Sequence, residues 1–171
     1  MITKGATVML IGDSLASGME QKFISLARRG GYVPVSHTAN GSSIFQWIKW
    51  IKNDLEKNRP ELILISLGTN DATIYSKVIQ NQKLYQDLFK EIEDSGAVHV
   101  WIEPPNISKN RIPKISETKN IIRKFSVFSF ESEKIGMQIG NDGVHPSALG
   151  YSKWMESVWN WMIQKNIVEP Q

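Results

Sequence analysis

Cysteine is absent from the sequence. This absence excludes disulfide bonds, thiolate nucleophiles and metal sites with cysteine ligands, and it fits a reducing compartment. If the chain performs nucleophilic catalysis, the nucleophile is therefore not a thiol.

Long hydrophobic runs are also missing. No apolar run approaches the roughly 20 residues of a membrane-spanning helix, so none is predicted. The start, "MITKGATVMLIGD", has one lysine before an apolar run of about five residues, shorter than the roughly 7–15 of a signal-peptide core. We therefore expect a cytoplasmic protein, while export by another route, processing or fusion stays open.

A strong excess of one charge is lacking as well. The 20 basic and 17 acidic residues leave a formal net charge of +3, a weak field compared with dedicated nucleic-acid binders, so no nucleic-acid partner is expected. The one local excess is residues 109–124, where six basic residues accompany a single acid, Glu117. This segment is interpreted as a solvated helix face or as a patch that steers an anionic substrate.

Several motifs of cofactor and metal chemistry are missing. The sequence has no GxGxxG, no GxxxxGK[ST] and no HExxH, so no organic cofactor and no metal are expected. A GxSxG nucleophile elbow is absent too, which disfavours an ordinary α/β-hydrolase.

What is present is an alternation of apolar segments with amphipathic ones. The expected strands are residues 7–11, 32–38, 62–67, 97–103 and either 126–130 or 134–139. The expected helices are residues 17–29, 44–57, 81–96, 116–124 and a last one after "NDGVHP", with Pro146 in its first turn. This order predicts βαβ units, and hence an α/β fold with a parallel sheet covered on both faces, in a single domain spanning residues 1–171. Pro34 suggests that the second strand lies at an edge of the sheet.

Four of the polar turns in this pattern share a location. "GDS", "NGSS" and "GTND" fall after strands, at the sheet edge where parallel α/β folds form their sites, and "NDGVHP" joins them if residues 134–139 are the fifth strand. Ser14 follows the first strand at the expected start of a helix, where free backbone N–H groups favour negative charge. Taken alone, Ser14 fits a helix cap better than a nucleophile, and Asp13 fits a structural turn residue whose carboxylate binds local N–H groups.

A possible base for Ser14 is His145. Asp142 precedes it by three residues, close enough to hydrogen-bond one imidazole nitrogen and to support the charge that appears when the other takes a proton. His37 and His99 lie in expected strands without such a partner and are interpreted as structural or surface residues.

Gly41 and Asn70 could complete such a site. Glycine lets a backbone N–H approach a substrate closely, and an asparagine amide can donate to an oxyanion. Each residue by itself also fits an ordinary turn.

The motifs "GDSL" (12–15), "NGSS" (40–43), "GTND" (68–71) and "DGVHP" (142–146) together resemble the SGNH hydrolases, also called GDSL esterases and lipases. They occur in the family's order and span nearly the whole chain. The resemblance implies a flavodoxin-like three-layer α/β/α sandwich with a mainly parallel sheet of about five strands.

The resemblance also implies roles for the matching residues. Ser14 would be the nucleophile, His145 the general base and then acid, and Asp142 the residue that orients it. The oxyanion hole would consist of the backbone N–H groups of Ser14 and Gly41 with the side chain of Asn70.

The function predicted on this basis is a serine esterase that forms an acyl-enzyme. Short connections after the strands favour a small acyl group, such as acetyl on a carbohydrate, and residues 104–117 are the candidate specificity segment. One alternative is a lysophospholipase or thioesterase with Phe45, Trp47 or Trp101 as an apolar wall. A non-catalytic anion-binding or glycan-binding module and an acyltransferase also stay open, and the sequence predicts no oligomeric state.

Overall fold

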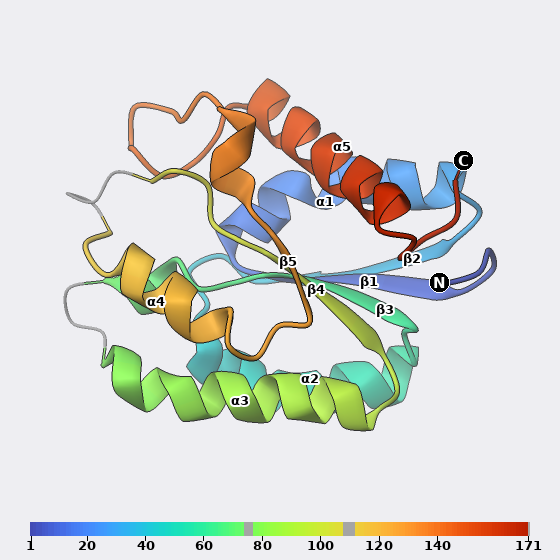
Figure 1. Ribbon diagram of the computed structural model, residues 1–171, viewed down its shortest axis with the longest axis horizontal. Coiled ribbons are helices and arrows are strands. Elements are labelled where there is room, and N and C mark those ends of the chain that lie inside the picture. The colour runs from blue at the N-terminus through green and yellow to red at the C-terminus, as the bar shows by residue number, and fades with distance from the viewer. Residues whose placement is uncertain (74–76, 108–111, 171) are drawn as a thin grey trace.

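A five-stranded sheet forms the centre of the protein (Figure 1). The computed structural model describes residues 1–73, 77–107 and 112–170. The strand order is β2-β1-β3-β4-β5, and all four neighbouring pairs are parallel. The strands are β1 (Thr7–Gly12), β2 (Val33–Thr38), β3 (Leu62–Ser66), β4 (Val98–Ile102) and β5 (Phe128–Phe130). The predicted α/β class and five-strand parallel sheet are confirmed.

Helices cover both faces of this sheet. They are α1 (Ser14–Arg29), α2 (Ile44–Asn58), α3 (Val78–Asp94), α4 (Ile115–Ile122) and α5 (Ala148–Gln164), with 3₁₀ turns η1 (Asn70–Ala72) and η2 (Ser132–Ile135). Figure 1 shows α1 and α5 on one face and α2, α3 and α4 on the other, which makes three layers. No helix in the described parts of the chain is long and apolar enough to cross a membrane.

The apolar run of β1 is explained by burial on both sides. Val8 and Leu10 belong to the core under α1 and α5, whereas Met9 and Ile11 belong to the core under α2 and α3. All four side chains are fully buried. Because successive side chains of a strand point to opposite faces, a strand between two helical layers needs apolar residues at every position.

Local hydrogen bonds determine where α2 and α5 begin. Ser43 and Gln46 form a capping box at the start of α2. At α5 the N-cap is Ser147, whose hydroxyl accepts from the N–H of Gly150 at 3.1 Å. Pro146 therefore precedes the cap, and the prediction that it lies in the first helical turn is wrong. It instead pairs with Ile139 in an isolated antiparallel bridge.

The sequence left two candidates for the fifth strand and predicted that the second strand lies at an edge of the sheet. β5 lies within the first of the two candidate segments, residues 126–130, whereas the second, residues 134–139, begins inside η2 and forms no strand of the sheet. β2 lies at the edge of the sheet, as Pro34 indicated, and pairs only with β1.

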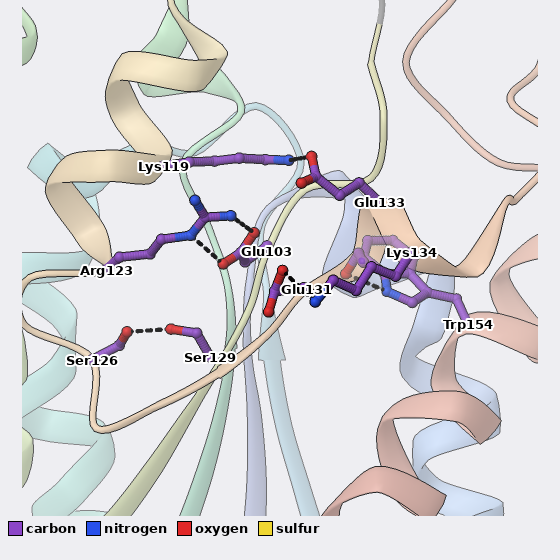
Figure 2. Close-up of polar contacts among 10 residues, drawn as sticks. Glu103, Lys119, Arg123, Ser126, Ser129, Glu131, Glu133, Lys134 and Trp154 are labelled. Atoms are coloured by element: carbon purple, nitrogen blue, oxygen red, sulfur yellow. Dashed lines mark hydrogen bonds and ion pairs between the residues drawn. The ribbon is translucent and has the colours of Figure 1, made fainter.

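The basic segment that contains α4 is not a uniformly solvated face (Figure 2). Arg123 donates two hydrogen bonds of 2.6 Å to the carboxylate of Glu103, which is fully buried just after β4. Lys119 is buried too and pairs with Glu133 at 3.2 Å. Two of the cations that the sequence placed on a solvated face therefore tie α4 to β4 and to η2.

Candidate active site

The turn between β1 and α1 holds Ser14 at the sheet edge. Gly12 ends β1 with φ +149°, and a Cβ there would lie 1.9 Å from the carbonyl oxygen of Ser66 on β3. Asp13 is the N-cap of α1, and its carboxylate accepts from the N–H of Leu15 at 2.9 Å. Ser14 is the first residue of the helix and is half-buried. Only glycine fits at position 12, so the close approach of β1 and β3 there determines where Ser14 lies.

Ser14 lies within hydrogen-bond distance of His145. Its Oγ is 2.8 Å from Nε2 of that histidine, across 131 positions of sequence. The other ring nitrogen, Nδ1, is 2.6 Å from a carboxylate oxygen of Asp142. The structure thus brings these three predicted residues into one continuous chain of hydrogen bonds.

Asp142 is held by the backbone as well as by the imidazole. Its second carboxylate oxygen accepts from the N–H groups of Val144 and His145, both at 2.9 Å. These backbone hydrogen bonds, followed by the bond from the imidazole, hold the pKa of Asp142 well below its ordinary value. The carboxylate is therefore ionised at neutral pH, which fixes Nδ1 as the donor and leaves Nε2 free to accept from Ser14.

Gly41 and Asn70 lie at the same edge of the sheet. The N–H of Ala39, before the Gly41 turn, donates to the carbonyl of Gly12 at 2.9 Å. The Asn70 side-chain amide donates to the carbonyl of Ser42 at 2.9 Å. Gly41 has φ +75°, a conformation that favours glycine. These bonds keep both residues beside the end of β1.

Two backbone donors at this edge are without an acceptor. Within residues 1–73, 77–107 and 112–170, the N–H groups of Ser14 and Gly41 donate no hydrogen bond. The Asn70 amide nitrogen carries two hydrogens, of which one is used on Ser42. These three donors lie on segments that follow β1, β2 and β3 at the same end of the parallel sheet, and Ser14 also stands at the positive end of the α1 dipole.

Asp71 anchors the loops that carry these donors, a role the sequence analysis did not find. Its carboxylate accepts from the N–H of Ile44 at 3.2 Å and from the hydroxyl of Tyr85 at 2.6 Å. Burial raises the pKa of Asp71. The signal was present in "GTND", but only the fold shows that α2 and α3 supply the partners.

Asp13 combines a capping role with deep burial. Burial raises its pKa to about 7, and the nearby carboxylate of Asp71 adds to this effect. One of its oxygens has no hydrogen-bond partner among the described residues. Asp13 does not contact the Ser14 hydroxyl in any hydrogen bond, in keeping with its interpretation as a turn residue.

The other two histidines are apart from this chain of hydrogen bonds. His37 bonds to Asp54 at 2.7 Å, a carboxylate on α2 that the sequence analysis did not connect with it. His99 is buried and accepts from the N–H of Val127 at 3.1 Å. No group of three or more metal-ligating side chains occurs in the described residues.

Two of the three residues of the aromatic wall in the long-chain alternative are not available at the surface. Trp47 and Trp101 are fully buried in the core between the sheet and α2 and α3, and Phe45 is exposed. Of the candidate specificity segment 104–117, residues 108–111 lie outside the described residues.

The arrangement has a defined chemical capability. A serine hydroxyl bonded to a neutral imidazole loses its proton as it attacks an electrophilic carbon, and a carboxylate on the other nitrogen stabilises the imidazolium. Donors aimed at the same point stabilise an oxyanion. These are the requirements of acyl transfer.

Comparisons with known proteins agree with this fold. The family described as "Protein of unknown function (DUF459)" matches residues 7–129. No curated protein matches the chain.

Several solved structures share the whole architecture. A psychrotrophic esterase EstA from Pseudoalteromonas sp., solved with monoethylphosphonate as inhibitor, has a TM-score of 0.74 at 18% identity, covering 95% of this chain and 98% of its own. An acetyl xylan esterase, AlAXEase, has a TM-score of 0.78 at 18% identity, covering 92% and 100%. TesA has a TM-score of 0.72 at 22% identity, covering 91% and 97%. The predicted resemblance to the SGNH hydrolases is confirmed for the fold.

Proposed function

Since the chain belongs to the family described as "Protein of unknown function (DUF459)", we propose a function for it from its site: it is a carboxylic ester hydrolase of the SGNH type. The observation that carries this proposal is the 2.8 Å contact between Ser14 Oγ and His145 Nε2. A helix-capping serine needs no such partner, and a simple anion cradle needs neither a base nor a carboxylate behind it.

The mechanism follows from the geometry. Ser14 Oγ attacks the ester carbonyl while His145 takes its proton, and the oxyanion that forms is stabilised by the N–H groups of Ser14 and Gly41 and by the Asn70 amide. His145 then gives the proton to the leaving alcohol, which leaves an acyl-enzyme. Water, deprotonated by the same imidazole, releases the acid and restores the serine. Asp142 keeps the imidazole in the tautomer that these steps need.

The substrate that we favour is a small acyl group, such as acetyl, on a carbohydrate. Trp47 and Trp101 are in the core and cannot line a channel for a long acyl chain. The site is also open, because the side chains of His145 and Asp142 are 42% and 53% exposed. An open site accepts a bulky alcohol such as a sugar, and one structural neighbour is named an acetyl xylan esterase. Preference for octanoyl over acetyl esters would contradict this choice.

The test of the reaction is Ser14→Ala. We expect it to abolish labelling by an organophosphonate and to lower kcat for 4-nitrophenyl acetate by at least about 10⁴-fold, since the nucleophile is gone. The rate of 4-nitrophenol release gives kcat, and the intact mass of the protein shows whether the phosphonate is attached. Unchanged turnover in this variant would rule out the proposal.

A second variant separates the nucleophile from the oxyanion donors. Asn70→Ala keeps Ser14 and His145, so labelling is expected to persist at a lower rate. Its kcat is expected to fall by about 10²–10³ through loss of one donor.

A further inference from the structure

A pocket of about 240 Å³ borders Asn70, on the side where α2 and α3 begin. Phe45 of α2 lines it, together with Lys77, Gln80 and Asn81 at the start of α3. Asn70 belongs both to this pocket and to the oxyanion site assigned above. The pocket therefore adjoins the proposed oxyanion site through Asn70.

Asn81 carries an unsatisfied polar group at this pocket. Its side chain is only 4% exposed, and its Oδ1 has no hydrogen-bond partner among the described residues. A buried amide oxygen without a partner is destabilising, so such groups in native proteins call for an explanation. Asn81 lines the pocket, and because the final torsion of asparagine is broad, the amide can rotate to meet a ligand there. The missing partner is a hydrogen-bond donor.

Phe45 presents an apolar surface at the same pocket. Its side chain is 53% exposed, although it stands on a helix whose other large apolar residues are largely buried. Ile44 and Trp47, its neighbours on α2, are in the core. An exposed ring beside a pocket offers a flat face for stacking.

The charges at the pocket narrow the chemistry of the ligand. Lys77 is exposed at the rim and disfavours a cationic donor such as an ammonium group. Asp71 also borders the pocket, but its oxygens are engaged by Ile44 and Tyr85. These charges therefore favour a neutral donor, such as a hydroxyl, for the Asn81 oxygen.

Resting on the proposed function, the geometry points to a sugar subsite: the pocket binds the ring of a carbohydrate ester, with an apolar ring face on Phe45 and a hydroxyl on the Asn81 amide. A pyranose combines an apolar face with hydroxyls at its edge, which is the pairing that these two residues require. The volume, about eight waters at roughly 30 Å³ each, suits one ring rather than a long chain. Phe45 and Asn81 then determine specificity, and Ser14 and His145 perform the reaction.

The test compares two esters in wild type, Phe45→Ala and Asn81→Leu. One ester is acetylated xylobiose and the other is 4-nitrophenyl acetate, which lacks the sugar. In each variant we expect the ratio of kcat/KM for the sugar ester to that for the aryl ester to fall about tenfold, mainly through KM for the sugar ester. Val127→Ala, which truncates another exposed apolar side chain just before β5, is the matched control and should leave the ratio unchanged.

A melting curve gives a second readout for Asn81. Since Asn81→Leu removes a buried unsatisfied amide, we expect its Tm to rise by about 2–4 °C while sugar preference is lost. A purely structural asparagine would lose Tm and change both ester rates alike. A ratio that stays unchanged in both variants, or that falls equally in Val127→Ala, overturns the subsite and leaves the esterase proposal intact. A wild-type protein that turns over neither ester and takes no phosphonate label overturns both.

Discussion

Asp13 and Ser14 are neighbours in the sequence with opposite environments. The carboxylate of Asp13 is fully buried with a pKa of about 7, while the hydroxyl of Ser14 is half-open and faces His145. The two residues share one turn because the helix needs a cap at the position directly before the serine. At the scale of single residues, the turn that carries Ser14 therefore also holds a buried acid, which caps the helix and makes no hydrogen bond to the Ser14 hydroxyl.

Asp13 is expected to make stability depend on pH. Its carboxyl binds a proton more tightly in the folded state, with a pKa of about 7 against an ordinary value of 3.8. The folded state is thus favoured most below about pH 4, and this contribution is lost as pH rises through 7. We expect the free energy of unfolding of wild type to fall by roughly 2–4 kcal/mol from pH 4 to pH 8, relative to Asp13→Asn.

Urea unfolding at each pH measures this difference. Asparagine keeps an acceptor for the N–H of Leu15, so the cap remains while the titration is removed. If the free energy of unfolding changes with pH in the same way in both proteins, Asp13 does not titrate in this range.

The turn from β1 to α1 shows how one element positions chemistry. β1 and β3 approach so closely at Gly12 that the backbone of Ser66 occupies the place of a side chain. This contact determines the direction in which the chain leaves the sheet, and with it the direction of the Ser14 side chain.

Gly12→Ala is expected to be strongly disruptive. The new Cβ would lie 1.9 Å from a backbone oxygen that cannot move without parting two strands, at φ +149°. We expect a loss of about 4 kcal/mol or more in the free energy of unfolding, with esterase activity lost in any folded fraction.

The matched control is Gly136→Ala. Its φ is +65°, but no atom of the described structure lies within 4 Å of the added Cβ, so about 1–2 kcal/mol is expected. Equal losses in the two variants, measured by urea unfolding, would mean that backbone strain alone accounts for Gly12.

The pairing of β4 with α4 depends on a buried carboxylate (Figure 2). Arg123→Ala leaves Glu103 buried without its partner, and we expect a loss of about 3 kcal/mol. Replacing both residues by methionine should recover most of this loss, because no unpaired charge remains.

Lys134→Ala provides the comparison. It breaks the exposed pair with Glu131 and should cost less than about 1 kcal/mol. If chemical denaturation gives the same loss of unfolding free energy for Arg123→Ala and Lys134→Ala, the buried pair contributes no more to stability than the exposed one.

At the scale of the whole molecule, the sheet separates two hydrophobic cores. One lies under α1 and α5, the other under α2 and α3. The backbone of the sheet stands between the two cores, so their members on α1 and α5 and on α2 and α3 lie on opposite faces. Mutations in different cores should therefore act independently.

This independence is testable with Ile51→Val in α2 and Met155→Ala in α5. Single losses of about 0.5–1.5 and 2–5 kcal/mol are expected, and the double variant should equal their sum within about 0.5 kcal/mol. The contrasting pair is Phe23 and Trp159, whose rings meet edge to face with their centroids 6.5 Å apart. The losses of unfolding free energy in Phe23→Leu and Trp159→Phe should therefore not be additive in the double variant. Coupling above about 1 kcal/mol across the sheet, in equilibrium unfolding, would contradict the two-core description.

The fold class was readable from the sequence because its signals are local. Continuous apolar runs such as that of β1 require burial on both faces, and helical spacing of apolar residues indicates one covered face. Asp142 and His145 could be paired for the same reason, being three residues apart. The strand ends also marked the edge at which the site lies.

Contacts between distant segments were decided only by the tertiary structure. The distance between Ser14 and His145 depends on the strand order and on where α5 packs, which no local pattern encodes. The burial of Glu103 and Trp101 likewise depends on which elements cover β4. The sequence by itself determined the candidate site residues and the places where strands end, because these follow from side-chain chemistry and short-range geometry. Tertiary packing decided which of these residues come into contact, because it depends on contacts between segments that are far apart in the sequence.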